Sequence, residues 1–211
     1  MDLTSPLRTL APSLESAILE VLAGTESALS ASTIARLSRR GTRQGQWTVL
    51  TRLVGHGLVL ADPSSMGSLY RLNREHVLAP AVLSAVAARQ EVLRRLTAAV
   101  ADLGPVASAA VYGSFARREA EEDSDVDLLL VITNDVDPDD DAWHTGVMAL
   151  EDRFLRWTGN RLEPLVLTED GLRRVVHADE PLVRSWQQGA LTLYGRDLGA
   201  LLGAVDRAGT A

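Results

Sequence analysis

The first third of the chain carries apolar residues at helical spacing, interrupted by serine, threonine and glycine. Between Leu14 and Leu22 they recur every three or four positions, which is typical of an amphipathic helix with one buried face. With serine or threonine as N-caps and glycine as stops, the pattern predicts two more helices and then a hairpin. The expected elements are helices from Ser13 to Gly24, from Ser30 or Ser32 to Gly41 and from Thr42 to Gly55, then strands at 58–60 and 69–72 around a loop at 62–67.

A long helical pattern follows, and the remaining segments alternate between strands and helices. Apolar residues spaced by three, four and seven positions predict one helix over 79–103, which Gly104 and Pro105 end. Its apolar stripe packs either on the chain's own domains or in the seam of a homodimer. The later pattern predicts a mixed sheet with flanking helices, an α+β fold overall. The expected strands are 106–112, 128–132, 161–167 and 191–195, and the expected helices are 115–121, 143–157 and 170–188.

Composition narrows the class of protein. Of 211 residues, 46% are hydrophobic and 23% are charged, which suits folded domains rather than global disorder. The chain has no cysteine, so disulfides and cysteine-held metals are excluded, and it has no lysine to serve a P-loop. No apolar run approaches the roughly 18 residues of a membrane span. The first residues lack a signal-peptide pattern, so we expect a cytoplasmic protein that makes no membrane contact.

Charge divides the chain into two different halves. Residues 1–103 hold 11 arginines against 8 acids, a net charge of +3, whereas residues 104–211 hold 10 against 20, a net charge of −10. The contrast is sharpest over 27–61, with five arginines and no acid. Such a stretch is either a solvated basic face or a surface that contacts nucleic acid.

Three helices followed by a hairpin is the element order of a winged helix-turn-helix. The stretch TIARLSRRGTRQGQWTVLTRLVGHGLVLADPSSMGSLYRL resembles the bacterial ArsR- and MarR-like winged-helix regulators. The resemblance implies that the third helix enters the major groove of double-stranded DNA and reads base edges. Trp47 is expected in the core or at its boundary rather than against a base. The candidate DNA-binding residues are Arg39 and Arg40 for phosphates and Arg43, Gln44, Gln46 and Arg52 for bases.

The chemistry concentrates in the segment VASAAVYGSFARREAEEDSDVDLLLVI, residues 106–132. Gly113 lets backbone N–H groups approach a phosphate closely, and the hydroxyl of Ser114 adds a donor. The helix expected after this turn points its positive dipole end to the same place. Asp125 and Asp127 are two positions apart on a strand, so both carboxylates face one side. Oxygen ligands at that spacing suit Mg²⁺.

The segment contains Gly-Ser, then ten residues, then Asp-x-Asp at the start of a strand. This pattern resembles the nucleotidyltransferase superfamily of DNA polymerase beta, especially the minimal nucleotidyltransferases. The resemblance implies binding of a nucleoside triphosphate (NTP) at Gly113 and Ser114, with Arg117 as a further phosphate contact. It also implies a third metal-binding carboxylate on a neighbouring strand, where this chain has Glu163. Two features depart from the family pattern: glutamate is one methylene longer than the usual aspartate, and Pro164 favours an edge strand. Glu163 is therefore either a third ligand and general base or a surface acid.

Together these patterns predict a winged helix-turn-helix domain at 1–76, a linker helix at 77–104 and a nucleotidyltransferase-like domain at 105–211. The expected activity is Mg²⁺-dependent transfer of a nucleoside monophosphate from an NTP to a hydroxyl acceptor. Two alternatives stay open. One is a transcription regulator that responds to nucleotide without turnover. The other is an antitoxin-type nucleotidyltransferase that acts on a toxin-like protein partner, a HEPN-type ribonuclease.

Overall fold

The computed structural model describes residues 1–65, 67–138, 140–178 and 180–209. The chain divides into two compact units. One unit comprises Asp2 with residues 4–89, and the other comprises Met1 and Leu3 with residues 90–211. Each unit has its own hydrophobic interior. Among the described residues, no helix combines the length and the apolar character needed to cross a membrane.

The first unit combines helices with a small antiparallel sheet, in which the strand order is β1-β3-β2. The Ser30 side chain accepts a hydrogen bond from the N–H of Thr33, so Ser30 rather than Ser32 is the N-cap of α3. The Thr42 side chain accepts one from the N–H of Gly45, which confirms the predicted N-cap of α4. Its elements are α1 (Leu7–Leu10), α2 (Leu14–Ala23), β1 (Leu29–Ser30), α3 (Ala31–Ser38), α4 (Arg43–Gly55), β2 (Val59–Ser64), β3 (Gly67–Leu72) and α5 (Ala79–Val86).

The hairpin between β2 and β3 is longer than the sequence predicts. The ladder pairs Val59 with Leu72 at one end and continues to Ser64 opposite Gly67. Most of the loop expected at 62–67 is therefore strand, and Met66 lies outside the described residues. The cross-strand pairing continues through Pro63, which lacks a donor, because β2 is an edge strand of this sheet.

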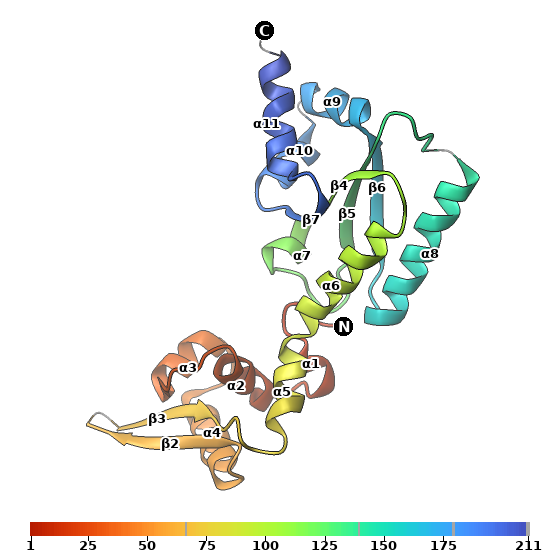
Figure 1. Ribbon diagram of the computed structural model, residues 1–211. Coiled ribbons are helices and arrows are strands. Elements are labelled where there is room, and N and C mark those ends of the chain that lie inside the picture. Colours follow the sequence, from red (N-terminus) through yellow and green to blue (C-terminus); the bar gives the residue numbers. More distant parts are fainter. Residues whose placement is uncertain (66, 139, 179, 210–211) are drawn as a thin grey trace. The chain divides into compact units, whose positions relative to one another are not determined.

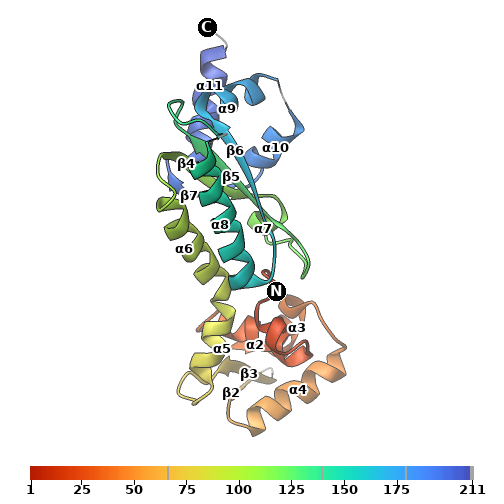
Figure 2. The same ribbon diagram turned by 90° about the vertical axis from the view of Figure 1, so that its right-hand side faces the viewer.

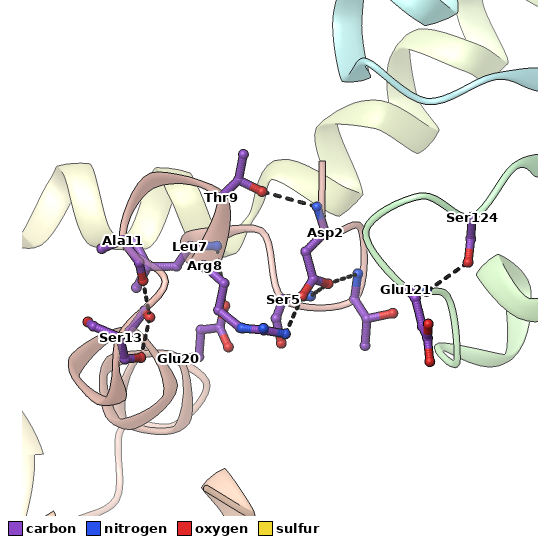
Figure 3. A network of polar contacts seen from close by, with 12 residues as sticks. Asp2, Ser5, Leu7, Arg8, Thr9, Ala11, Ser13, Glu20, Glu121 and Ser124 are labelled. Atoms are coloured by element: carbon purple, nitrogen blue, oxygen red, sulfur yellow. Dashed lines mark hydrogen bonds and ion pairs between the residues drawn. The ribbon is translucent and has the colours of Figure 1, made fainter. Parts of the chain in front are cut away.

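A polar network organises the start of the first unit (Figure 3). The carboxylate of Asp2 accepts hydrogen bonds from the N–H groups of Thr4 and Ser5, at 3.1 and 2.7 Å, and pairs with Arg8 at 2.6 Å. A carboxylate oxygen of Glu20 on α2 accepts a hydrogen bond from the N–H of Leu7 at 3.2 Å. These contacts satisfy the free N–H groups ahead of and at the start of α1 and fasten that short helix to α2.

The predicted helix over 79–103 is in fact two helices, α5 and α6 (Ala88–Ala101). Ala87 lies between them, and its N–H bonds to the carbonyl of Leu83 at 2.9 Å. The apolar stripe that looked continuous serves two separate cores: Val82 is buried in the first unit, while Leu96 and Val100 are buried in the second. Periodicity alone does not distinguish one helix from two in this case, because both halves keep helical spacing.

The second unit is built on a four-stranded sheet of order β6-β5-β4-β7 (Figure 1). Strand β4 runs antiparallel to β5 and β7, while β5 and β6 are parallel. Besides α6, its elements are β4 (Val106–Tyr112), α7 (Gly113–Arg117), β5 (Val126–Ile132), α8 (Asp141–Thr158), β6 (Leu162–Thr168), α9 (Glu169–His177), α10 (Pro181–Gln187), β7 (Leu191–Gly195) and α11 (Leu198–Gly209).

Helices cover both faces of this sheet (Figures 1 and 2). Helices α6 and α8 pack on one face, against the even-numbered residues of β5 from Val126 to Ile132. Helices α9, α10 and α11 pack on the other face, against Leu129 and Val131. Because side chains alternate along a strand, Asp127 belongs to the face that α9, α10 and α11 cover, at its open end where β5 begins.

Candidate active site

The turn after β4 brings Gly113 directly against Asp127. Tyr112, the last residue of β4, lies opposite Asp127 in the antiparallel ladder, and the chain then turns through Gly113 with φ +69°. A Cβ added to Gly113 would overlap the Oδ2 atom of Asp127 and would lie 3.2 Å from its Cγ. The Gly-Ser turn and the second aspartate of Asp-x-Asp, 14 positions apart in sequence, thus form one corner of the second unit. Glycine is required there both for its dihedral and for its lack of a side chain.

Glu163 enters this corner from the neighbouring strand. Strands β5 and β6 are parallel and in register, with Asp127 beside Glu163, so the two side chains point to the same face. Glu163 is exposed on an edge strand, as Pro164 predicts, and Asp125 is exposed just before β5. Three carboxylates therefore gather in one region. Among the described residues, however, no three acidic or histidine side chains already converge into a metal-binding group.

The carboxylates interact electrostatically. Partial burial raises the pKa of Asp127, and the negative charges of Glu163 and Asp125 raise it further. The opposing effect of the Arg117 guanidinium is smaller than each of these. A corner that holds several like charges with little cationic compensation favours a cation or a proton.

The helix after the Gly-Ser turn is shorter than expected. Helix α7 has five residues and ends at Arg118 in the left-handed region, with φ 62°, whereas the sequence predicts a helix over 115–121. Its dipole is therefore small, and the Gly-Ser backbone and hydroxyl are the principal donors of this turn. Arg117 pairs with Glu119 at 2.8 Å and remains about a third exposed, so its guanidinium can reach a ligand only by releasing that partner.

Asn160 holds the loop that leads into Asp125, a role that sequence reasoning missed. This buried residue follows α8, and its side-chain N–H₂ group donates to the carbonyls of Glu122 and Ser124, at 3.0 and 3.1 Å. Within that loop the N–H of Glu121 donates to the hydroxyl of Ser124 at 2.8 Å (Figure 3). The amide is 35 positions from Asp125 and belongs to no local motif. Its only sequence signal is an asparagine after a helix-ending glycine.

Tyr112, the residue opposite Asp127, packs against a second aromatic ring. Tyr112 meets Trp186 of α10 edge to face, with ring centroids 6.2 Å apart and planes at 84°. Both residues are buried. Burial raises the pKa of the Tyr112 hydroxyl, and the charges of Asp127 and Glu163 raise it further. The pair packs α10 onto the end of β4 and so supports the turn at Gly113.

In the first unit, the structure exposes some of the predicted DNA-binding residues and buries one. Gln46 is 4% exposed, and its side-chain N–H₂ group donates to the Arg40 carbonyl and to Ser38. The expectation that Gln46 faces outward is therefore wrong, because its amide closes the turn between α3 and α4. Trp47 is 56% exposed, so the prediction that it lies in the core or at its boundary is also wrong. Arg52 pairs with Glu15. The side chains of Arg39, Arg40, Arg43 and Gln44 are exposed.

Comparison with known families finds a similarity over the segment that holds this corner. Residues 93–173 match the family described as nucleotidyltransferase domain. The matched range contains Gly113, Ser114, Asp125, Asp127 and Glu163, and it confirms the enzyme class that the sequence predicts.

The comparison with solved structures gives a weaker similarity. A solved structure called a "putative nucleotidyltransferase", from Sulfolobus solfataricus, is 19% identical, with 54% of this chain and 88% of that chain covered and a TM-score of 0.33. At that TM-score the overlap supports no inference about this chain. No curated protein matches it.

Proposed function

We propose that the second unit transfers a nucleoside monophosphate from an NTP to a hydroxyl acceptor. The observation that carries this proposal is the corner itself, where Gly113 lies against Asp127 and Glu163 lies beside Asp127 in register. The family match over 93–173 supports the same reaction class. An NTP phosphate group needs closely spaced donors, which the backbone of the Gly-Ser turn and the Ser114 hydroxyl offer.

The reaction is a substitution at the α-phosphorus. The acceptor oxygen forms a bond to that phosphorus, the bond from phosphorus to the bridging oxygen breaks, and pyrophosphate leaves. Glu163 takes the proton of the acceptor hydroxyl, because it is an exposed carboxylate on the same face as Asp127. The Gly-Ser turn holds the phosphates, and Arg117 joins it on releasing Glu119.

The donor set suits Mg²⁺. Asp125, Asp127 and Glu163 supply carboxylate oxygens, which are the ligands that this hard cation prefers. When bound, Mg²⁺ neutralises phosphate charge and lowers the pKa of an attacking hydroxyl. The carboxylates are near one another and not yet converged, so we expect the cation and the NTP to bind together.

Calorimetry with ATP, GTP, CTP and UTP, with and without Mg²⁺, tests this proposal. We expect heats for at least one NTP that require Mg²⁺ and that disappear in Asp125→Ala/Asp127→Ala. The matched control is Glu121→Ala/Asp123→Ala, which removes two exposed acids from the same loop and leaves β5 intact. Equal, negligible heats for all four NTPs in both conditions would refute nucleotide binding. If an NTP binds but no pyrophosphate is released with any hydroxyl acceptor, the result would favour a regulator that senses nucleotide.

We propose further that the first unit is a winged helix that binds double-stranded DNA. Three observations support this: helices α2 to α4 precede the β2–β3 hairpin, the stretch 27–61 has five arginines and no acid, and α4 exposes Arg43 and Gln44. Residues exposed on such a helix can reach base edges in the major groove. Gln46 is left out of this proposal because its side chain is buried.

A gel shift on the DNA upstream of the chain's own gene tests the DNA proposal. Arg43→Ala is expected to weaken binding by about 1–3 kcal/mol. Arg52→Ala is expected to cost less, because that arginine is already paired with Glu15. Arg74→Ala, which removes a positive charge outside 27–61, is the control. Absence of salt-sensitive binding to any duplex would refute the proposal and favour a protein-docking role for the first unit.

A further inference from the structure

A cavity of the second unit lies next to the helix that begins with the Gly-Ser turn. Its volume is about 380 Å³, which falls within the roughly 300–1,000 Å³ of small-molecule sites. The walls come from the end of α10, the start of β7 and the first turns of α11. Its lining includes Trp186, Gly189, Thr192, Asp197, Gly199 and Gly203.

The strand register places this cavity at the same end of the sheet as the carboxylates. Leu191 and Thr192, at the start of β7, pair with Val111 and Ala110, near the end of β4. A Cβ added to Gly189 would lie 3.6 Å from the Cγ of Arg117, so the cavity wall touches helix α7. Trp186, which lines the cavity, also contacts Tyr112, the residue opposite Asp127.

The polar groups of the cavity suit a ligand that donates hydrogen bonds and carries no negative charge there. Asp197 is exposed, and its two oxygens accept one hydrogen bond each, from the N–H of Ala200 at 2.9 Å and from the Thr192 hydroxyl at 3.2 Å. Each oxygen keeps a lone pair for a ligand. Among the described lining residues none is cationic, so a phosphate has no partner in this cavity.

The wall that α11 contributes is open. Gly199 and Gly203 lie one helical turn apart and both line the cavity, so neither of them contributes a side chain to that wall. A flat ring needs such a surface, because any side chain at these positions would occupy its place. The lining residues Trp186, Leu198 and Leu202 supply apolar contact beside it.

We propose that this cavity receives the base of the nucleotide and that Asp197 selects bases with an exocyclic amino group. The inference rests on the proposed function, since the Gly-Ser turn would hold the phosphates while the adjacent cavity holds the base. Adenine, cytosine and guanine carry such an amino group, and uracil does not. A site that hydrogen-bonds a substrate group rejects the analogue that lacks it. ATP, CTP and GTP are therefore bound more tightly than UTP.

Two variants separate this proposal from simple loss of folding. Gly203→Leu fills the cavity from a helical position, and Ala204→Leu adds the same side chain at an exposed neighbouring position of α11 outside the lining. Asp197→Asn retains an oxygen for the N–H of Ala200 and loses one acceptor for the ligand. Thermal unfolding of each variant verifies that α11 remains packed.

Calorimetry with Mg²⁺-ATP, Mg²⁺-UTP and adenosine is the measurement. We expect Gly203→Leu to raise the Kd of both ATP and adenosine about tenfold or more, and Ala204→Leu to leave both within about twofold of wild type. Asp197→Asn should bring the Kd of ATP close to that of UTP. ATP binding that is indifferent to Gly203→Leu would overturn the base cavity and leave the proposed function standing. If Gly203→Leu abolishes adenosine binding but the wild type transfers no nucleotide, the base cavity stands and the proposed function is overturned. Absence of binding by all three probes overturns both the base cavity and the proposed function.

Discussion

Replacing Gly113 by alanine tests whether the Gly-Ser turn and Asp127 form one unit. The added methyl group would occupy the place of the Asp127 Oδ2 atom, so the carboxylate must rotate away. The backbone must also keep φ +69° with an L side chain. The variant therefore probes a steric contact and a dihedral at the same position, and the two effects need to be separated.

The magnitudes follow from these two effects. An L residue in the left-handed region costs about 1–2 kcal/mol. Turning the aspartate side chain away from a preferred rotamer costs about 0.5–1.5 kcal/mol more. Alanine also reduces the entropy of the unfolded chain, which offsets about 0.4–1 kcal/mol. We expect a net loss of stability near 2 kcal/mol and, because a displacement of about 1 Å can cost 100-fold, a fall in kcat of about that size.

Gly159 provides the matched control. It belongs to the same unit and has φ +75°, and the nearest atom to an added Cβ is 4.0 Å away. Gly159→Ala therefore reports the dihedral cost without a clash, and its activity should stay close to that of the wild type. Urea unfolding gives the free energies, and release of pyrophosphate from an NTP gives kcat.

A double-mutant cycle decides the outcome. In the Asp127→Ala background the clashing carboxylate is absent, so adding Gly113→Ala should cost only about what Gly159→Ala costs. We expect a coupling free energy of about 1 kcal/mol between positions 113 and 127. If Gly113→Ala costs the same in both backgrounds, the contact with Asp127 contributes nothing and this reasoning is refuted.

Three further predictions concern stability. Burial and like charges raise the pKa of Asp127, so that group stabilises the fold below its unfolded pKa, and this contribution is lost as the pH rises through its folded pKa. Asp127→Asn should therefore raise the Tm at neutral pH but not at acid pH, in scans without divalent cations. A Tm gain that is the same at every pH would contradict this prediction. Asn160→Ala removes two hydrogen bonds to the loop before Asp125, so it should lower the free energy of unfolding by about 1–3 kcal/mol and also lower kcat. An unchanged kcat would show that the loop holds its position without the amide. Gln46→Ala should destabilise the first unit by about 1–3 kcal/mol. Gln44→Ala, at an exposed position of the same helix, should leave the Tm unchanged. Equal Tm values for the two variants would refute the structural role of Gln46.

The sequence by itself determined the features that depend on neighbouring residues: helix caps, helix ends, single strands and short motifs. The N-caps Ser30 and Thr42, the strand at 106–112 and the end of α8 at Gly159 all follow from residues within a few positions of each other. The Gly-Ser turn and the Asp-x-Asp pair could be found for the same reason. Their chemistry lies in short spacings along one chain segment, and backbone geometry converts such spacings into faces and turns.

Only the tertiary structure decided which distant residues share a corner. The register of β5 and β6 placed Glu163 beside Asp127, and the end of α8 brought Asn160 to the loop before Asp125. Packing likewise buried Gln46 and divided the apolar stripe of 79–103 between two cores. The spacing of residues within one segment does not determine strand register or burial, because both depend on contacts between segments that are far apart in the chain.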